Sequence, residues 1–71
     1  ILVADDSSTQ RALMRSLLED WDRTAHIDMA PCGASCLEHL RSNPYDLAFI
    51  DVHMPGMSGL EVCGLANLEQ R

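Results

Sequence analysis

The chain has 71 residues, which is enough for one small domain. Hydrophobic residues make up 46% of it and charged residues 23%, and this balance excludes the apolar-poor, highly charged composition of a disordered chain. The formal net charge is −6 and every basic residue is a scattered Arg, so we expect neither direct nucleic-acid contact nor a basic helix lying on a membrane.

We expect no targeting signal from the residues of this sequence. No apolar run approaches the roughly 20 residues that span a bilayer, and no secretory signal opens the chain. The three Cys residues have no framework spacing and are typical of reduced thiols, so we expect a cytoplasmic location. The chain starts within an apolar run without Met and stops within a helical pattern, so both ends are expected to be cuts in a longer sequence.

The first elements are a buried strand and an amphipathic helix. Residues 1–4 form a short apolar run of the kind that fills a strand buried on both faces of a parallel sheet. Ser7 or Ser8 can cap the helix that follows. Over residues 9–21, apolar side chains recur every three or four positions, which predicts one buried helix face. That face comprises Leu13, Met14, Leu17, Leu18 and Trp21.

A second strand and helix follow. Residues 26–30 alternate weakly between polar and apolar, which predicts a short strand, and residues 31–33 form a turn. The spacing predicts a helix over residues 34–41, with Cys36, Leu37 and Leu40 on its buried side. Pro44 ends this helical segment, because the residue before Pro avoids the helical region.

The last strand leads into a Pro- and Gly-rich loop and a third helix. Residues 47–50 are apolar and end at Asp51, and residues 54–59 form the loop. A helix is predicted over residues 60–70, with Leu60, Cys63 and Leu68 as its apolar positions. The resulting βαβαβα order implies a parallel sheet with helical crossovers, which is an α/β fold.

Two of the predicted strands end in carboxylates. Asp5 and Asp6 follow the first strand, and Asp51 follows the third. Ligands of open parallel sheets bind beyond the carboxyl ends of the strands, so the three acids would converge on one crevice if these strands are neighbours. Mg²⁺ suits such an oxygen-rich site. An Asp at this position can also attack phosphorus without a general base, because it is already anionic at pH 7.

Three segments resemble the receiver domains of response regulators in two-component signalling. Residues 1–7, Ile-Leu-Val-Ala-Asp-Asp-Ser, resemble the first strand and acidic pair of that family. Residues 51–61, with the run Asp-x-x-Met-Pro-Gly-Met-x-Gly, resemble its phosphoacceptor loop, and residues 30–37 are similar to its second strand and helix entry. The resemblance covers essentially the whole chain.

The resemblance implies a flavodoxin-like fold. Receiver domains are a known example of the doubly wound (βα)₅ parallel sheet with strand order 2-1-3-4-5. Residues 1–71 would be a partial receiver domain, truncated to about the first three βα units. The Ser or Thr after the fourth strand of the family and the Lys after the fifth would be missing. The chain contains no Lys, so we expect it to be incompetent for phosphotransfer by itself.

The resemblance also implies a role for each acid. Asp51 would accept the phosphoryl group, Asp6 would ligate Mg²⁺ directly, and Asp5 would help through water. His53 would offer its backbone carbonyl to the metal. The implied donor is a histidine kinase or phosphotransfer protein, and the implied receiver of the signal is an output domain or downstream protein. Such a domain catalyses its own phosphorylation and is not counted as an enzyme.

Two other functions stay open. A receiver-like module that is never phosphorylated would only dock partners, but it would have no need of all three acids. An aspartate-nucleophile phosphohydrolase usually carries a second Asp two residues after the nucleophile, where this chain has His53. Cys32 and Cys36 lie four residues apart but have no partner pair for zinc, so Cys36 is expected to be a small buried residue.

Overall fold

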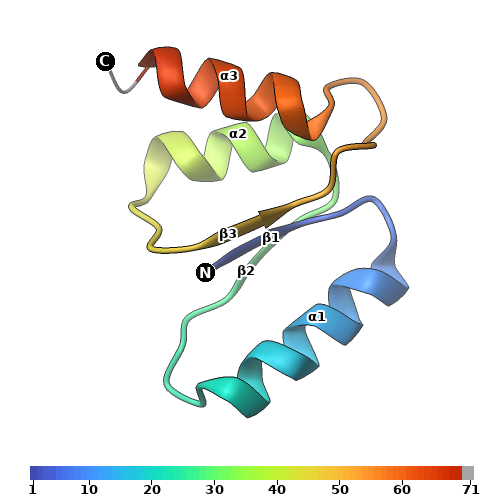
Figure 1. Cartoon of the computed structure of the whole chain (residues 1–71), viewed down its shortest axis with the longest axis vertical. Coiled ribbons are helices and arrows are strands. Elements are labelled where there is room, and N and C mark those ends of the chain that lie inside the picture. The colour runs from blue at the N-terminus through green and yellow to red at the C-terminus, as the bar shows by residue number, and fades with distance from the viewer. Residues whose placement is uncertain (70–71) are drawn as a thin grey trace.

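The computed structural model describes residues 1–69, and the side chains of residues 1–66. Three short strands and three helices alternate along the chain, as the sequence predicts (Figure 1). None of the helices in this described part has the length and apolar character that a bilayer crossing requires. The elements are β1 (Leu2–Ala4), α1 (Ser8–Trp21), β2 (Asp28–Ala30), α2 (Gly33–Ser42), β3 (Ala48–Ile50) and α3 (Gly59–Glu69).

The strands form a parallel sheet with the order β2-β1-β3. Leu2 pairs with Asp28 on one side and with Ala48 on the other, so the strands start and end level with one another. Helix α1 covers one face of the sheet, and α2 and α3 lie together on the opposite face (Figure 1). This arrangement is the doubly wound, flavodoxin-like class that the sequence predicts, with strands in the order 2-1-3.

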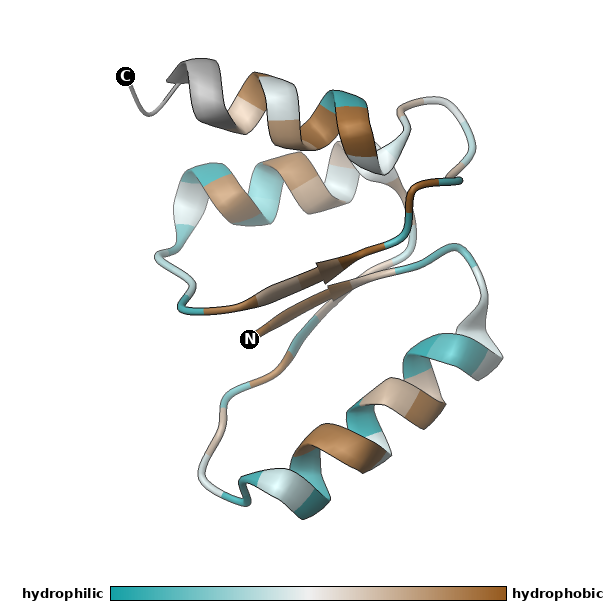
Figure 2. Ribbon diagram, in the orientation of Figure 1, coloured by the Kyte–Doolittle hydropathy of each residue, from teal (hydrophilic) through white to brown (hydrophobic). Residues whose placement is uncertain are grey.

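The main core lies between the sheet and the two helices α2 and α3. Cys36 is fully buried there and Leu37 nearly so, with Leu40 packed against them, which confirms the predicted face of α2. Leu2, Ala4 and Ala30 supply the sheet side of this core. Figure 2 shows hydrophobic, brown segments along β1 and β3 between the helical layers.

The predicted face of α3 is wrong. Among the described side chains of α3, Val62 is fully buried, whereas Leu60 is 70% exposed and Cys63 is also exposed. Apolar residues occur on all sides of α3, so its sequence gives no periodic signal for one face. Close contact of Gly59 with the backbone of Asp51 fixes the start of the helix instead. The predicted apolar position Leu68 lies outside the described side chains.

The opposite face of the sheet is only partly covered. Of the five apolar residues predicted to face inward from α1, Leu18 is buried, but Leu13 and Leu17 are each more than half exposed and Trp21 is 70% exposed. Phe49 of β3 points to this same side, because its neighbours along the strand face the α2 and α3 core. Helix α1 therefore has the predicted periodicity, but the sheet covers only a narrow part of its apolar face.

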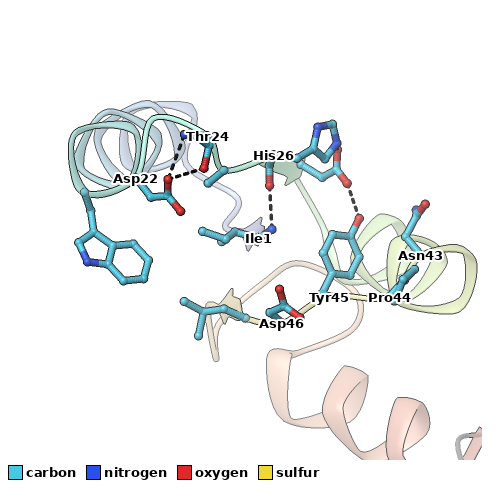
Figure 3. A pocket seen from close by; sticks show the side chains of 12 residues that line it. Ile1, Asp22, Thr24, His26, Asn43, Pro44, Tyr45 and Asp46 are labelled. Atoms are coloured by element: carbon cyan, nitrogen blue, oxygen red, sulfur yellow. Dashed lines mark hydrogen bonds and ion pairs between the residues drawn. The ribbon is translucent and has the colours of Figure 1, made fainter.

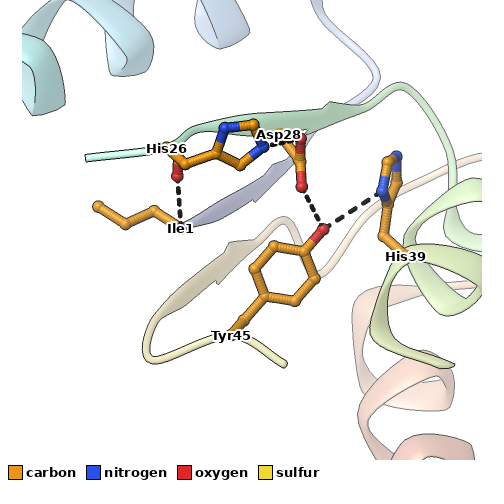
Figure 4. Close-up of polar contacts among 5 residues, drawn as sticks. All are labelled: Ile1, His26, Asp28, His39 and Tyr45. Atoms are coloured by element: carbon orange, nitrogen blue, oxygen red, sulfur yellow. Dashed lines mark hydrogen bonds and ion pairs between the residues drawn. The ribbon is translucent and has the colours of Figure 1, made fainter. Parts of the chain in front are cut away.

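A hydrogen-bond network ties the amino edge of the sheet together (Figure 4). The Tyr45 hydroxyl donates to Asp28 Oδ2 at 2.5 Å, and it lies 3.3 Å from His39 Nδ1 on α2. His26 Nε2 lies 2.9 Å from the other oxygen of Asp28. The Tyr45 hydrogen bond, followed by that of His26, holds the pKa of Asp28 below its usual value. Burial, and then the hydrogen bond to Asp28, raise the pKa of Tyr45 to about 12.

Stability at alkaline pH should report this network. In the unfolded chain Tyr45 ionises near the ordinary Tyr pKa of about 10, and in the folded chain at about 12. Its contribution to the unfolding free energy is therefore complete below the lower value and is lost as the pH rises through the upper one. Urea unfolding from pH 9 to pH 12 should show a decline that is shallower in Tyr45→Phe.

Ionisation of Cys36 lowers the unfolding free energy over an overlapping pH range, because burial raises the pKa of its thiol to about 11. Cys36 is present in both proteins, so its contribution cancels when the unfolding free energies of Tyr45→Phe and the unmodified chain are subtracted. Identical declines in the two proteins would show that burial and the Asp28 hydrogen bond do not raise the pKa of Tyr45 in solution.

We expect the isolated chain to be loosely folded or to associate. The outer edge of β3 has no pairing strand among the described residues, and the apolar side chains of Leu13, Leu17 and Phe49 are exposed. Open strand edges and contiguous apolar surface both promote association. Sedimentation velocity over a dilution series should show concentration-dependent assembly. A monomer with a sharp two-state melt at all concentrations would contradict this expectation.

Candidate functional site

Three acidic side chains meet at the carboxyl edge of the sheet. Ligand oxygens of Asp5, Asp6 and Asp51 all lie within 4.8 Å of one another. The pairing of β1 with β3 brings them together, because the Asp51 amide donates to the Ala4 carbonyl at 2.8 Å. The Asp5 amide donates to the Ala30 carbonyl of β2 at 3.1 Å. Sheet hydrogen bonds therefore fix the backbone on both sides of the acidic cluster.

Local turns orient two of the carboxylates. The Ser7 amide donates to Asp5 Oδ1 at 2.9 Å, and the His53 amide donates to Asp51 Oδ1 at 3.1 Å. In each residue a backbone amide of the following turn binds one carboxylate oxygen. Asp6 is exposed to solvent. The His53 side chain is exposed as well, and the proposed use of its carbonyl as a metal ligand stays a prediction.

The β1–α1 loop is held by residues that sequence reasoning did not single out. Ser7 is the N-cap of α1, as predicted, and its hydroxyl accepts the Gln10 amide at 3.3 Å. Arg11 Nη1 donates to the backbone carbonyl of Asp5 at 2.7 Å. One sequence signal could have identified Arg11, because a cation near a helix N-terminus is electrostatically unfavourable and needs a compensating partner.

The loop after Asp51 passes close to two helix starts. A Cβ at position 59 would overlap the carbonyl of Asp51, and one at position 33 would overlap the carbonyl of Met57. The Gly59 amide also donates to the Val52 carbonyl at 3.1 Å. Gly59 therefore lets α3 begin directly against the backbone that carries Asp51.

The acids line a hollow of about 690 Å³ that opens on the α1 side of the sheet. In the part of the chain that the structure describes, no Arg or His side chain forms an ion pair with any of the three carboxylates. Clustered anionic oxygens without a protein cation suit a hard divalent cation such as Mg²⁺. The lining residues are Ala4, Asp5, Asp6, Ser7, Gln10, Met14, Phe49, Ile50 and Asp51.

A second hollow of about 530 Å³ lies at the opposite, amino edge of the sheet (Figure 3). Trp21 of α1 and Tyr45 before β3 are among its lining residues, and it shares none with the acidic hollow. The Ile1 amino group donates to the His26 carbonyl at 2.8 Å at its edge. This hollow therefore belongs to the Tyr45 network and is separate from the three acids.

Comparison with known proteins gives concordant results. The sequence profile of the response regulator receiver domain matches residues 1–70. The chain is 36% identical over 61 residues to the response regulator UvrY of Escherichia coli (strain K12), which covers 86% of this chain and 28% of that protein. It is 34% identical over 73 aligned positions to the chemotaxis protein CheY of Pseudomonas aeruginosa, covering 100% of this chain and 56% of that protein.

Further similarities extend to a kinase and to a solved structure. The chain is 31% identical over 65 residues to the histidine-protein kinase BarA of E. coli (strain K12), covering 92% of this chain and 7% of that protein. A CheY-like receiver domain from Methanospirillum hungatei JF-1 superposes with a TM-score of 0.84 at 25% identity, covering 97% of this chain and 53% of that one. The chain thus spans little more than half the length, or less, of each of these proteins.

Two glycines of α3 provide a matched test of the contact beneath Asp51. Gly59→Ala should lower the unfolding free energy by about 1–3 kcal/mol, as overpacking does, because the new methyl group meets backbone that cannot move aside. Gly64→Ala meets open space within the same helix and should raise it by about 0.5–1 kcal/mol. Urea unfolding below the concentration of association would measure both. Equal effects of the two substitutions would contradict the contact.

Proposed function

Because this chain belongs to the response regulator receiver domain family, we propose that Asp51 accepts a phosphoryl group at a Mg²⁺ site formed with Asp5 and Asp6. The observation that carries this proposal is the convergence of the three carboxylates at one edge of the sheet. Each acid comes from the motif position that the family resemblance assigns to it. Receiver domains are signalling domains, and their phosphorylation state is the signal.

The chemical step needs little from the protein. A phosphohistidine is the donor, and a free carboxylate oxygen of Asp51 attacks its phosphorus. The new O–P bond forms as the N–P bond breaks, and the bonding electron pair stays with the imidazole nitrogen, which takes a proton from solvent. Asp51 Oδ1 accepts the His53 amide, so Oδ2 is the oxygen free to attack. In-line positioning is the main task of the site.

The site residues fit a hard divalent cation. Asp6 and Asp51 would hold Mg²⁺ directly, with Asp5 acting through water and His53 through its backbone carbonyl. When bound, Mg²⁺ supplies positive charge against the phosphoryl oxygens. The hydrogen bonds from Ser7 and His53 support this assignment, because they orient two of the three carboxylates before any ligand arrives.

The domain boundaries are part of the proposal. We propose that residues 1–71 are the β1-to-α3 part of a receiver, about three of its five βα units. Coverage of only 56% of a CheY protein supports this, as do the uncovered face of α1 and the open edge of β3. The proposed partners are a histidine kinase or phosphotransfer protein as donor and an output domain or downstream protein as target.

Phosphorylation by acetyl phosphate tests the assignment in the longer protein that contains this segment. Intact mass spectrometry should show one added phosphoryl group that requires Mg²⁺ and disappears in Asp51→Asn. Asp46→Asn is the control, because Asp46 is a solvent-accessible Asp that lines the opposite, amino edge of the sheet. Asp6→Asn should raise the Mg²⁺ concentration needed for half-maximal phosphorylation at least tenfold, as about 1.4 kcal/mol of lost binding would.

Other outcomes would favour the alternatives. A folded protein that gains no mass would support an interaction module that is not phosphorylated. Steady turnover of phosphate esters, lost in Asp51→Asn, would instead support a phosphohydrolase.

A further inference from the structure

Among the described residues that line the acidic hollow, one has a side-chain N–H donor. Of the nine residues that line it, three are carboxylates, four have apolar side chains and one is the capping Ser7. Only Gln10 carries a side-chain amide. A phosphoryl group on Asp51 would bring further negative charge into a hollow already lined by three acids, so a neutral donor there has a defined electrostatic use.

Helix α1 places Gln10 on the hollow that the three acids also line. Gln10 and Met14 lie one helical turn apart and both line the hollow, so this face of α1 is turned to the carboxyl edge of the sheet. The Ser7 hydroxyl accepts the Gln10 backbone amide at 3.3 Å, which fixes the first turn of the helix. The Gln10 side chain itself is exposed and has no hydrogen-bond partner in the described structure.

Arg11, the cation next to Gln10 in the sequence, already has a hydrogen-bond partner. The Arg11 guanidinium donates to the backbone carbonyl of Asp5 at 2.7 Å, and Arg11 does not line the hollow. The Ser7 hydroxyl also lines the hollow, and its oxygen accepts the Gln10 backbone amide in the N-cap. Among the described residues that line the hollow, Gln10 is therefore the one that offers a side-chain N–H, and its two N–H groups suit the oxygens of a phosphoryl group.

Resting on the proposed function, we infer that the Gln10 amide donates a hydrogen bond to an oxygen of the phosphoryl group on Asp51. Gln10 would thereby favour the phosphorylated state while leaving the metal to the three carboxylates. This role is specific to the transferred group, so phosphoryl binding and Mg²⁺ binding should respond differently when Gln10 is replaced.

Beryllofluoride is an analogue of the phosphoryl group. In the longer protein that contains this segment, it allows phosphoryl binding to be measured separately from Mg²⁺ binding. Gln10→Leu removes the donor and keeps similar size and helix propensity. With saturating Mg²⁺, its beryllofluoride affinity should fall about tenfold, as expected for losing a hydrogen bond to a charged group. Its affinity for Mg²⁺ alone should stay within about twofold of the unmodified protein, since no carboxylate is changed.

Thr9→Leu is the matched control, because Thr9 is the exposed neighbour of Gln10 and does not line the hollow. Fluorine NMR would measure bound beryllofluoride, calorimetry would measure Mg²⁺, and circular dichroism would check the fold. Unchanged beryllofluoride affinity in Gln10→Leu would overturn the inference, and so would an equal loss of Mg²⁺ affinity. Failure of the unmodified protein to bind beryllofluoride would overturn the proposed function itself.

Discussion

The parallel pairing of β1 with β3 is the constraint on which the rest of the structure depends. Ala4 pairs with Ile50, and the next amide along, that of Asp51, donates to the Ala4 carbonyl at 2.8 Å. Parallel strands end at the same edge, so the acids that follow β1 and β3 must emerge together. A slip of one residue would turn Ile50 out of the core and move Asp51 away from the acidic pair. Burial of the strand side chains therefore also determines the geometry of the site.

Holding three carboxylates together is unfavourable without a counter-charge, and the fold meets this cost with fixed backbone donors. The Ser7 and His53 amides each bind one carboxylate oxygen, and neither needs an ordered long side chain. Arg11 is bound to the Asp5 carbonyl and does not neutralise the carboxylates. The remaining negative charge is thus left exposed in the hollow, which is the electrostatic condition that suits a hard divalent cation.

The features that the sequence predicts well are those set by neighbours in the chain. The buried strand β1, the Ser7 cap and the position of each acid after its strand follow from local pattern and strand direction. The face of α3 could not be found this way, because its apolar residues lie on all sides and contact with Asp51 through Gly59 decides the orientation. The Tyr45–Asp28 bond spans 17 residues and leaves no local signal.

The two faces of the sheet differ in how accessible they leave Asp51. On the α2 and α3 side, buried Met54 and the tight contact at Gly59 fill the space beneath the acid. On the α1 side, Met14 and Phe49 line the open hollow, and the apolar side chains of Leu13 and Leu17 on α1 are exposed. A ligand can therefore reach Asp51 from the α1 side but not through the core. The side chain that such a ligand meets on α1, next to the acids, is Gln10, which gives this otherwise ordinary surface residue a place in the chemistry of the site.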